Sequence, residues 1–222
     1  MTRSATVVID TSSSYSILAI LLDAKVFSCQ IITEPKTLLR EIGLFSLQVR
    51  AEIDRIDNAQ IEIVLCVGPS GFSGGRIGVA TGRSLALGWG KGVIAFDHLE
   101  MMSYIVSNVA PHDFLIEDAK GGEVHLFDNR IRGSSSITLS FDDADSTIGQ
   151  SQSVTVIGAL PKGWESLSRE GVRVLDVNEL PIESKIASFV DAIKDRQRVS
   201  PDKLKIRYGR EYVAVANFEK LR

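Results

Sequence analysis

The chain has 222 residues and a net charge of −3, and its hydrophobic and charged fractions of 44% and 24% are those of a folded globular protein. This composition excludes an intrinsically disordered chain, and the length is sufficient for one large domain or two small ones. The two cysteines, Cys29 and Cys66, are too few and too far apart for a disulfide framework or a thiolate metal site.

The N-terminal region shows no sign of secretion or membrane insertion. Its longest apolar run, Ile17–Leu22, ends at Asp23 and is too short to cross a bilayer. A basic leader followed by a long apolar stretch and a small-residue cleavage site is also missing. We therefore expect a cytoplasmic protein that makes no contact with membranes.

The first half of the chain opens with three predicted strands and continues with alternating helices and strands. The strands cover Ala5–Ile9, Tyr15–Leu22 and Lys25–Ile32. They are followed, in order, by a helix at Lys36–Ile56, a strand at Ile61–Val67, a helix at Ser73–Gly90, a strand at Val93–Phe96 and a helix at His98–Val109. This order differs from the strict alternation of a doubly wound sheet. It resembles the order in which actin, the sugar kinases and Hsp70 build each of their domains.

The second half repeats this order in shortened form after a boundary at Pro111-His112-Asp113. The predicted elements are strands at Phe114–Asp118, Glu123–Phe127 and Arg130–Leu139, a polar loop at Ser140–Gln152, a strand at Val154–Ile157, a short helix at Gly163–Arg169, a strand at Val172–Leu175 and a helix at Glu183–Arg196. We predict an α/β protein of two actin-like (ASKHA, ribonuclease-H-like) domains, residues 1–110 and a reduced domain of residues 111–222. The tail, residues 196–222, is expected to pack back on the first domain.

Basic residues are concentrated in this tail. From Arg196 to Arg222 the chain has eight Lys or Arg against three acids, a net charge of +5, so the remainder carries −8. A basic segment of this kind can follow the phosphate backbone of a nucleic acid. The alternative is a solvated terminal segment whose charges have no ligand.

A short polar segment, Asp10-Thr11-Ser12, follows the first predicted strand directly. Small hydroxyl residues at such a turn can offer N–H and O–H donors to a phosphate, and a strand-end aspartate can orient a metal-bound water. Actin-like ATPases have their first phosphate loop at this place. Asp10, Thr11 and Ser12 are therefore candidates for a vestigial phosphate loop that binds ATP or ADP weakly. The alternative is an ordinary serine-rich hairpin turn.

The segment Gly68–Gly90 predicts a turn followed by a glycine-rich helix. Gly68-Pro69-Ser70-Gly71 cannot continue a strand, and Ser73 is a suitable N-cap. Three glycines then fall on one ridge of the helix at i, i+4 spacing, namely Gly74, Gly78 and Gly82. Each costs roughly 1 kcal/mol relative to alanine, so we expect another backbone to pack closely against the ridge. That backbone belongs either to this chain or to a partner.

The first eleven residues of that segment, GPSGFSGGRIG, resemble the Gly-Pro-Gly-Ser-Phe-Thr-Gly-x-Arg-x-Gly signature of the TsaB/YeaZ family. The third and fourth positions are interchanged and Ser73 replaces threonine. Weaker matches follow the family's order over nearly the whole chain, at Asp10-Thr11, at Asp118-Ala119-Lys120 with Glu123-Val124, and at Tyr208-Gly209-Arg210. His125 stands where the family has tyrosine, and the proline that usually precedes the last motif is missing.

The resemblance implies a glycoprotease-like, non-catalytic subunit of the machinery that makes threonylcarbamoyladenosine (t6A) in tRNA. It implies a TsaD-like catalytic subunit as partner, a TsaE-like ATPase as a further partner, and tRNA contact only within the complex. A second copy of the chain is an alternative partner. TsaD holds its metal through two histidines at i, i+4 spacing, whereas His98, His112 and His125 are not so spaced and are expected to be structural or solvent-facing. We therefore expect no metal site, no required cofactor and no catalysis by this chain alone.

The long first helix has two apolar sides. One stripe, the expected core face, consists of Leu38, Ile42, Phe45, Val49, Ile53 and Ile56. Leu44 and Leu47 fall on nearly the opposite side, either as isolated surface leucines or as part of an interface. In the TsaB/YeaZ family this helix and the glycine-ridge helix form the partner surface. The residues that the resemblance assigns to it are Leu44, Leu47, Phe72, Gly74, Arg76, Gly78 and Gly82.

Two other functions remain open at this stage. A stand-alone ATP-dependent phosphotransferase of the actin-like superfamily requires nucleotide binding through Asp10-Thr11-Ser12, and the shortened second half argues against it. A metalloprotease, the activity suggested by the glycoprotease-like label, lacks the histidine pair that would bind its metal.

Overall fold

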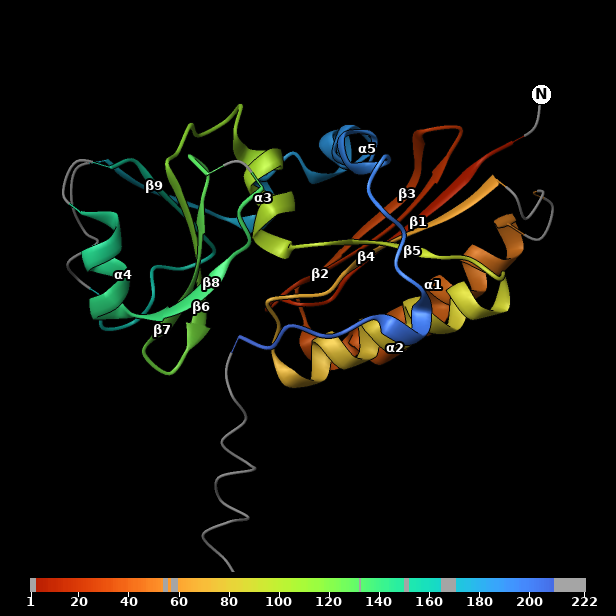
Figure 1. The fold of residues 1–222 in the computed structure, drawn as a ribbon, viewed down its shortest axis with the longest axis horizontal. Coiled ribbons are helices and arrows are strands. Elements are labelled where there is room, and N and C mark those ends of the chain that lie inside the picture. The colour runs from red at the N-terminus through yellow and green to blue at the C-terminus, as the bar shows by residue number, and fades with distance from the viewer. Residues whose placement is uncertain are drawn as a thin grey trace, which may run out of the picture.

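The structure is a computed structural model that describes residues 3–53, 56, 60–131, 133–149, 152–164 and 171–209. These residues form two five-stranded β-sheets and five α-helices, arranged as two halves side by side (Figure 1). Within the described ranges, no helix is long and apolar enough to cross a membrane.

The first sheet contains three antiparallel strands and two parallel ones. Its strands are β1 (Ala5–Asp10), β2 (Ser16–Leu22), β3 (Lys25–Ile32), β4 (Ile61–Cys66) and β5 (Val93–Phe96), in the spatial order β3-β2-β1-β4-β5. β2 pairs antiparallel with β1 and with β3, while β4 pairs parallel with β1 and with β5. The β-branched and leucine-rich runs that fill these strands suit a sheet that is buried on both faces.

The second sheet repeats this topology strand for strand. Its strands are β6 (Phe114–Lys120), β7 (Glu123–Asp128), β8 (Ile137–Ser140), β9 (Val154–Ile157) and β10 (Val172–Leu175), in the order β8-β7-β6-β9-β10. The antiparallel and parallel pairings also correspond, so β6 is the counterpart of β1. Two actin-like halves with a shortened second sheet confirm the predicted fold class, while the exact domain limits stay a prediction.

Helices cover both faces of the first sheet. α1 (Leu38–Ile53) and α2 (Phe72–Gly88) pack on one face, where the predicted stripe of α1 is buried in a common core with β1, β2 and β4. α3 (His98–Val106) and α5 (Ile182–Ile193) pack on the other face, in a core that also contains residues of the second sheet. α4 (Phe141–Ile148) covers the outer face of the second sheet (Figure 1).

The last helix of each half packs against the other half. α3 ends the first half but contacts β6 and β7 of the second, while α5 ends the second half but contacts β3 of the first. α3 and α5 also touch each other. The largest apolar core of the molecule therefore lies between the halves.

After α5, residues 194–209 return along the first half, and we call this segment the strap (Figure 1). Val199 exchanges two backbone hydrogen bonds with Val93 at the free edge of β5, of 2.9 and 2.8 Å. Farther on, the N–H of Arg207 donates to the carbonyl of Val67 (2.7 Å), and its carbonyl accepts from the N–H of Ser70 (3.1 Å). The strap thereby covers a sheet edge that would otherwise expose unpaired backbone groups.

The structure differs from the sequence prediction at three places. β8 starts at Ile137, seven residues later than predicted, and α4 replaces the polar loop predicted at 140–152. α4 buries Ala144 and Ile148 at i, i+4 spacing, and Ser140 caps it by accepting from the N–H of Asp143 (3.2 Å). α2 starts at Phe72 after an N-cap at Gly71, so Ser73 is not the cap. Most of the helix predicted at Gly163–Arg169 lies outside the described residues.

Candidate functional site

The predicted phosphate loop lies at the centre of the molecule, where the two halves meet. Asp10 ends β1, and Thr11 and Ser12 begin the turn to β2. All three residues are buried, with 1% of Asp10 exposed. The turn is therefore not an open surface loop, and its polar groups need partners within the protein.

The carboxylate of Asp10 is paired with the imidazole of His98, the first residue of α3. The Nδ1 atom of His98 lies 2.6 Å from Oδ2 of Asp10. On the other side of the ring, Nε2 lies 3.2 Å from Oε2 of Glu117 in β6 and 3.1 Å from the hydroxyl of Tyr15. One imidazole thus stands between carboxylates from the two halves.

Serine hydroxyls complete this arrangement. Ser12 donates to Oδ1 of Asp10 through its N–H (3.0 Å) and its hydroxyl (2.6 Å), and the hydroxyl of Ser13 donates to Glu117. We call Asp10, Ser12, Ser13, Tyr15, His98 and Glu117 the central polar cluster. The hydroxyl of Thr11 donates to the carbonyl of Gly74 (2.7 Å). The hydroxyl groups of Thr11, Ser12 and Ser13 are therefore engaged with the chain's own acceptors.

The electrostatics favour an ion pair inside the cluster. Burial by itself lowers the pKa of His98, but the carboxylates of Asp10 and Glu117 outweigh burial and hold this pKa well above its ordinary value of 6.5. Burial by itself raises the pKa of Asp10, whereas the charge and hydrogen bonds of His98 and Ser12 bring it below its ordinary value of 3.8. The cluster thus places one imidazole between two carboxylates, in surroundings that favour its charged form. Among the described residues, no group of three or more His, Cys, Asp or Glu is arranged to hold a metal ion.

The glycine ridge of α2 packs against this turn. A Cβ on Gly74 would lie closer than 3.0 Å to the carbonyl oxygen of Thr11, and a Cβ on Gly78 equally close to its Oγ1. A Cβ on Gly82 would lie 2.8 Å from a methyl carbon of Leu65. The close approach is thus made inside the chain, which resolves the alternative left open by the sequence. The interface role predicted for these three glycines is not supported, because they face inward.

Three of the remaining predicted interface residues, Leu44, Leu47 and Arg76, are exposed on α1 and α2. Leu44 and Leu47 of α1 are 54% and 66% exposed. Arg76 of α2 is exposed, and its Nε donates to the hydroxyl of Tyr208 in the strap (3.1 Å). Phe72 is the first residue of α2, and its side chain is outside the described part of the structure.

Asp97, which the sequence analysis overlooked, links three parts of the molecule. One oxygen caps α3 by accepting from the N–H groups of Leu99 (2.9 Å) and Glu100 (3.3 Å). The other accepts from the N–H (3.0 Å) and hydroxyl (2.7 Å) of Ser136 and pairs with Nη1 of Arg207 (2.9 Å). The spacing of Asp97 and Glu100 is that of a capping box, so the cap itself was readable from the sequence.

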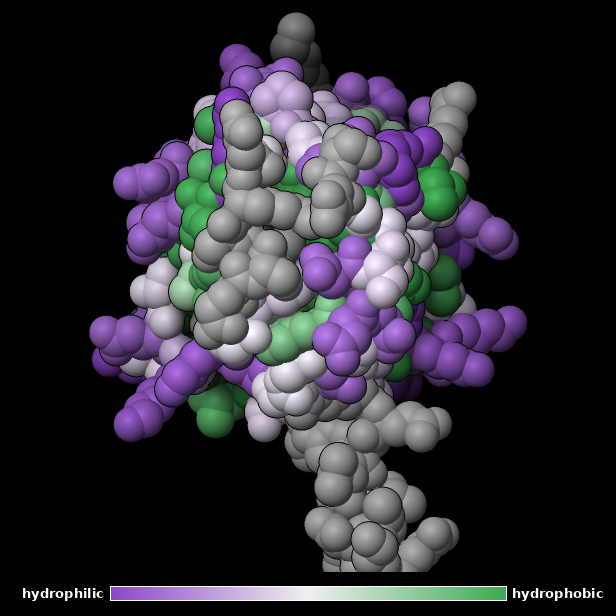
Figure 2. Space-filling view, turned by 90° about the vertical axis from the view of Figure 1, so that its left-hand side faces the viewer, coloured by the Kyte–Doolittle hydropathy of each residue, from purple (hydrophilic) through white to green (hydrophobic). Residues whose placement is uncertain are grey.

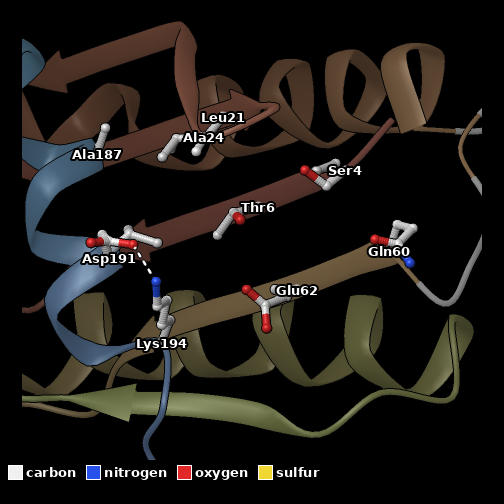
Figure 3. Close-up of a pocket in the computed structure, with 11 residues that line it drawn as sticks. Ser4, Thr6, Leu21, Ala24, Gln60, Glu62, Ala187, Asp191 and Lys194 are labelled. Carbon is white, nitrogen blue, oxygen red and sulfur yellow. Dashed lines mark hydrogen bonds and ion pairs between the residues drawn. The ribbon is translucent and has the colours of Figure 1, made fainter. Parts of the chain in front are cut away.

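A small cavity of about 220 Å³ lies at the beginning of β1, whereas Asp10 of the central polar cluster is at the end of this strand (Figure 3). It is enclosed by α5 and the beginnings of β1 and β4, and a hydrogen-bonded pair, Lys194 and Asp191 (2.7 Å), lies at its rim. In open α/β sheets, ligands bind at the carboxyl ends of the parallel strands. Because this cavity lies at the amino ends of β1 and β4, its position is not that of a ligand site in such sheets.

Comparison with known proteins shows which fold this is. No protein-family model and no curated protein sequence matches the chain. Among solved structures, YeaZ from Pseudomonas aeruginosa is similar with a TM-score of 0.68 and 17% identity, over 92% of this chain and 99% of YeaZ. An uncharacterized protein with similarity to peptidase YEAZ, also from P. aeruginosa, gives a TM-score of 0.66 and 18% identity, over 93% of this chain and 100% of that protein. The predicted likeness to YeaZ is thereby confirmed at the level of structure, and the chain has the YeaZ fold over almost its whole length.

Proposed function

We propose that this protein is a non-catalytic subunit of the t6A machinery that pairs with a TsaD-like catalytic subunit and supports its active conformation. The observation that carries the proposal is the YeaZ fold, since the structural match covers 99–100% of the two similar chains. The sequence also carries a TsaB-like signature at Gly68–Gly78. A TsaE-like ATPase is the further partner that we propose, and tRNA is contacted only within the complex. By the same reasoning the protein acts in the cytoplasm.

The proposed docking surface is the outer side of α1 and α2. Its apolar residues, which we call the leucine face, are Leu39, Leu44, Leu47 and Leu87. α1 packs on β2 and α2 on β1 and β4, so the two helices cover neighbouring strands of one sheet. Several exposed leucines on two adjacent helices favour a protein partner over isolated surface positions. Apolar and polar residues are interspersed over the end of the molecule formed by the second half (Figure 2).

Changing Leu47 to aspartate is expected to weaken binding of the TsaD-like subunit at least tenfold. Burying a leucine side chain fully is worth about 1.5–3 kcal/mol, and a carboxylate buried there without a partner adds to the loss. Titration calorimetry of the purified full chains measures the effect. Val174→Asp is the matched control, because Val174 is half-exposed on β10, away from the leucine face. Equal affinity of both variants would contradict the proposed surface.

Mg-ATP separates this proposal from a stand-alone phosphotransferase. The hydroxyls of Thr11 and Ser12 are engaged with Gly74 and Asp10, and we therefore expect no binding heat when the isolated protein is titrated with millimolar Mg-ATP. Binding that disappears in Asp10→Asn would instead support the phosphotransferase. Binding that persists in this variant would mean that the nucleotide binds elsewhere on the protein. The Leu47→Asp titration would then decide whether the protein pairs with the TsaD-like subunit.

A further inference from the structure

We propose that His98 is a built-in cation that holds the two halves of the protein together by bridging one carboxylate from each. The two carboxylates come from corresponding strands of the repeated topology, Asp10 from β1 and Glu117 from β6. The ring itself is 1% exposed. No function or site assigned above uses this bridge, and it is independent of any pairing with TsaD.

The two carboxylates that flank the ring favour its charged form. A neutral imidazole has one N–H, whereas an imidazolium has two. If Nδ1 carried the only proton and donated to Asp10, the lone pair of Nε2 would face the carboxylate of Glu117 at 3.2 Å. With both nitrogens protonated, Nδ1 donates to Asp10, and the positive charge of the ring faces Glu117 at 3.2 Å from Nε2.

The surroundings offer no substitute cation. The other titratable groups facing the cluster are Tyr15, Cys66, Asp97 and His125. Burial, with the nearby carboxylates, raises the pKa values of Tyr15 and Cys66 well above their ordinary values, so both are neutral at pH 7. Burial lowers the pKa of His125, so this ring is neutral as well. Among the described residues that face Asp10 and Glu117, His98 is therefore the one that carries a positive charge.

Without this charge, two buried carboxylates from opposite halves would repel each other. Breaking a buried ion pair by removing one partner is strongly destabilising, because it leaves an uncompensated charge. Because the folded-state pKa of His98 is raised, its contribution to stability is fully present below pH 6.5 and is lost as the pH rises through the folded pKa. Asp10, whose pKa is lowered, contributes above pH 3.8 and loses its contribution as the pH falls through its folded pKa.

NMR of the wild-type protein tests the charge directly. The ring-carbon and ring-nitrogen chemical shifts of the histidines are recorded between about pH 5 and about pH 9, a range that spans the ordinary histidine pKa. We expect His98 to remain an imidazolium at pH 8. His112 is the internal control, since burial lowers its pKa and its ring nitrogens bond to the hydroxyl of Ser103 and the carbonyl of Ala110. We expect His112 to be neutral at pH 7. A His98 ring that is also neutral at pH 7 would overturn the proposal.

Variants test the bridge. His98→Gln is expected to lower the melting temperature by roughly 5–15 °C, and Glu117→Gln in the same chain to restore part of this loss by removing the stranded charge. Independent, additive losses would overturn the proposal. The control His112→Gln is expected to show no such coupling with Glu117→Gln. Should His98→Gln fail to fold, the single variant Glu117→Gln remains decisive, because it must shift the pKa of His98 downward in the NMR titration.

Discussion

Replacing Gly74 by alanine is expected to lower the free energy of unfolding by about 3 kcal/mol, the upper end of the range for overpacked sites. The added Cβ would lie closer than 3.0 Å to the carbonyl oxygen of Thr11. Because this oxygen is backbone at the end of β1, it cannot rotate away as a side chain would. The hydroxyl of Thr11 is in turn bonded to the carbonyl of Gly74, so the helix and the turn must shift together. Urea denaturation followed by circular dichroism measures the change.

Gly43→Ala is the matched control for this experiment. Gly43 lies inside α1, is exposed, and has nothing within 4 Å of where a Cβ would be placed. Alanine there is expected to raise the free energy of unfolding by up to about 1 kcal/mol, the difference in helix propensity. If both variants changed stability in the same direction and by similar amounts, the close approach of α2 to Thr11 would be refuted.

Replacing Asp97 by alanine is expected to cost about 2–4 kcal/mol, because α3 loses its N-cap and the buried donors of Ser136 lose their acceptor. The side chain is 5% exposed, and its loss leaves Ser136 and Arg207 without their shared acceptor and α3 without its cap. The effect should reach both halves, since Ser136 precedes β8 while α3 and the strap lie against the first sheet. Loss of amide protection in α3, β8 and the strap together, measured by hydrogen exchange, would show this.

Ser140→Ala provides the comparison for Asp97. Ser140 caps α4, and its hydroxyl bonds to the N–H and the carboxylate of Asp143 at the exposed start of the same helix. Its replacement is expected to cost about 1 kcal/mol, the ordinary value of an N-cap. A loss at Asp97 no larger than the loss at Ser140 would mean that Asp97 is a helix cap and nothing more.

Local patterns predicted most of the fold. The β-branched and leucine-rich runs of β1 and β2, and the apolar stripe of the first helix, identify their elements because each pattern lies within a short stretch of the chain. α4 was missed because only Ala144 and Ile148 are apolar and buried among acidic and hydroxyl residues. Its acidic first turn, Asp142 and Asp143, is nevertheless typical of a helix start, where it interacts favourably with the helix dipole.

The central polar cluster could not be predicted in the same way. Its bonds join residues 88 and 104 positions apart, so they depend on how β1, α3 and β6 meet. The sequence analysis assigned His98 a structural or solvent-facing position, and the structure places it in the interior. One signal was present, because Glu117 lies in the apolar run of β6 and a carboxylate there requires a partner. Which partner it has was decided only by tertiary packing.

The strap, α3 and α5 make each half of the protein depend on the other. A fragment ending at residue 110 would lose α5 and with it the cover on its sheet, and the backbone of β5 would lose Val199. A fragment beginning at residue 111 would lack α3, which lies against β6 and β7. The two halves thus share one topology, but neither half is complete without the other. Each half supplies a helix that packs against the other half. Cutting the chain between them would therefore leave two aggregation-prone fragments with uncovered sheets and unpaired strand edges.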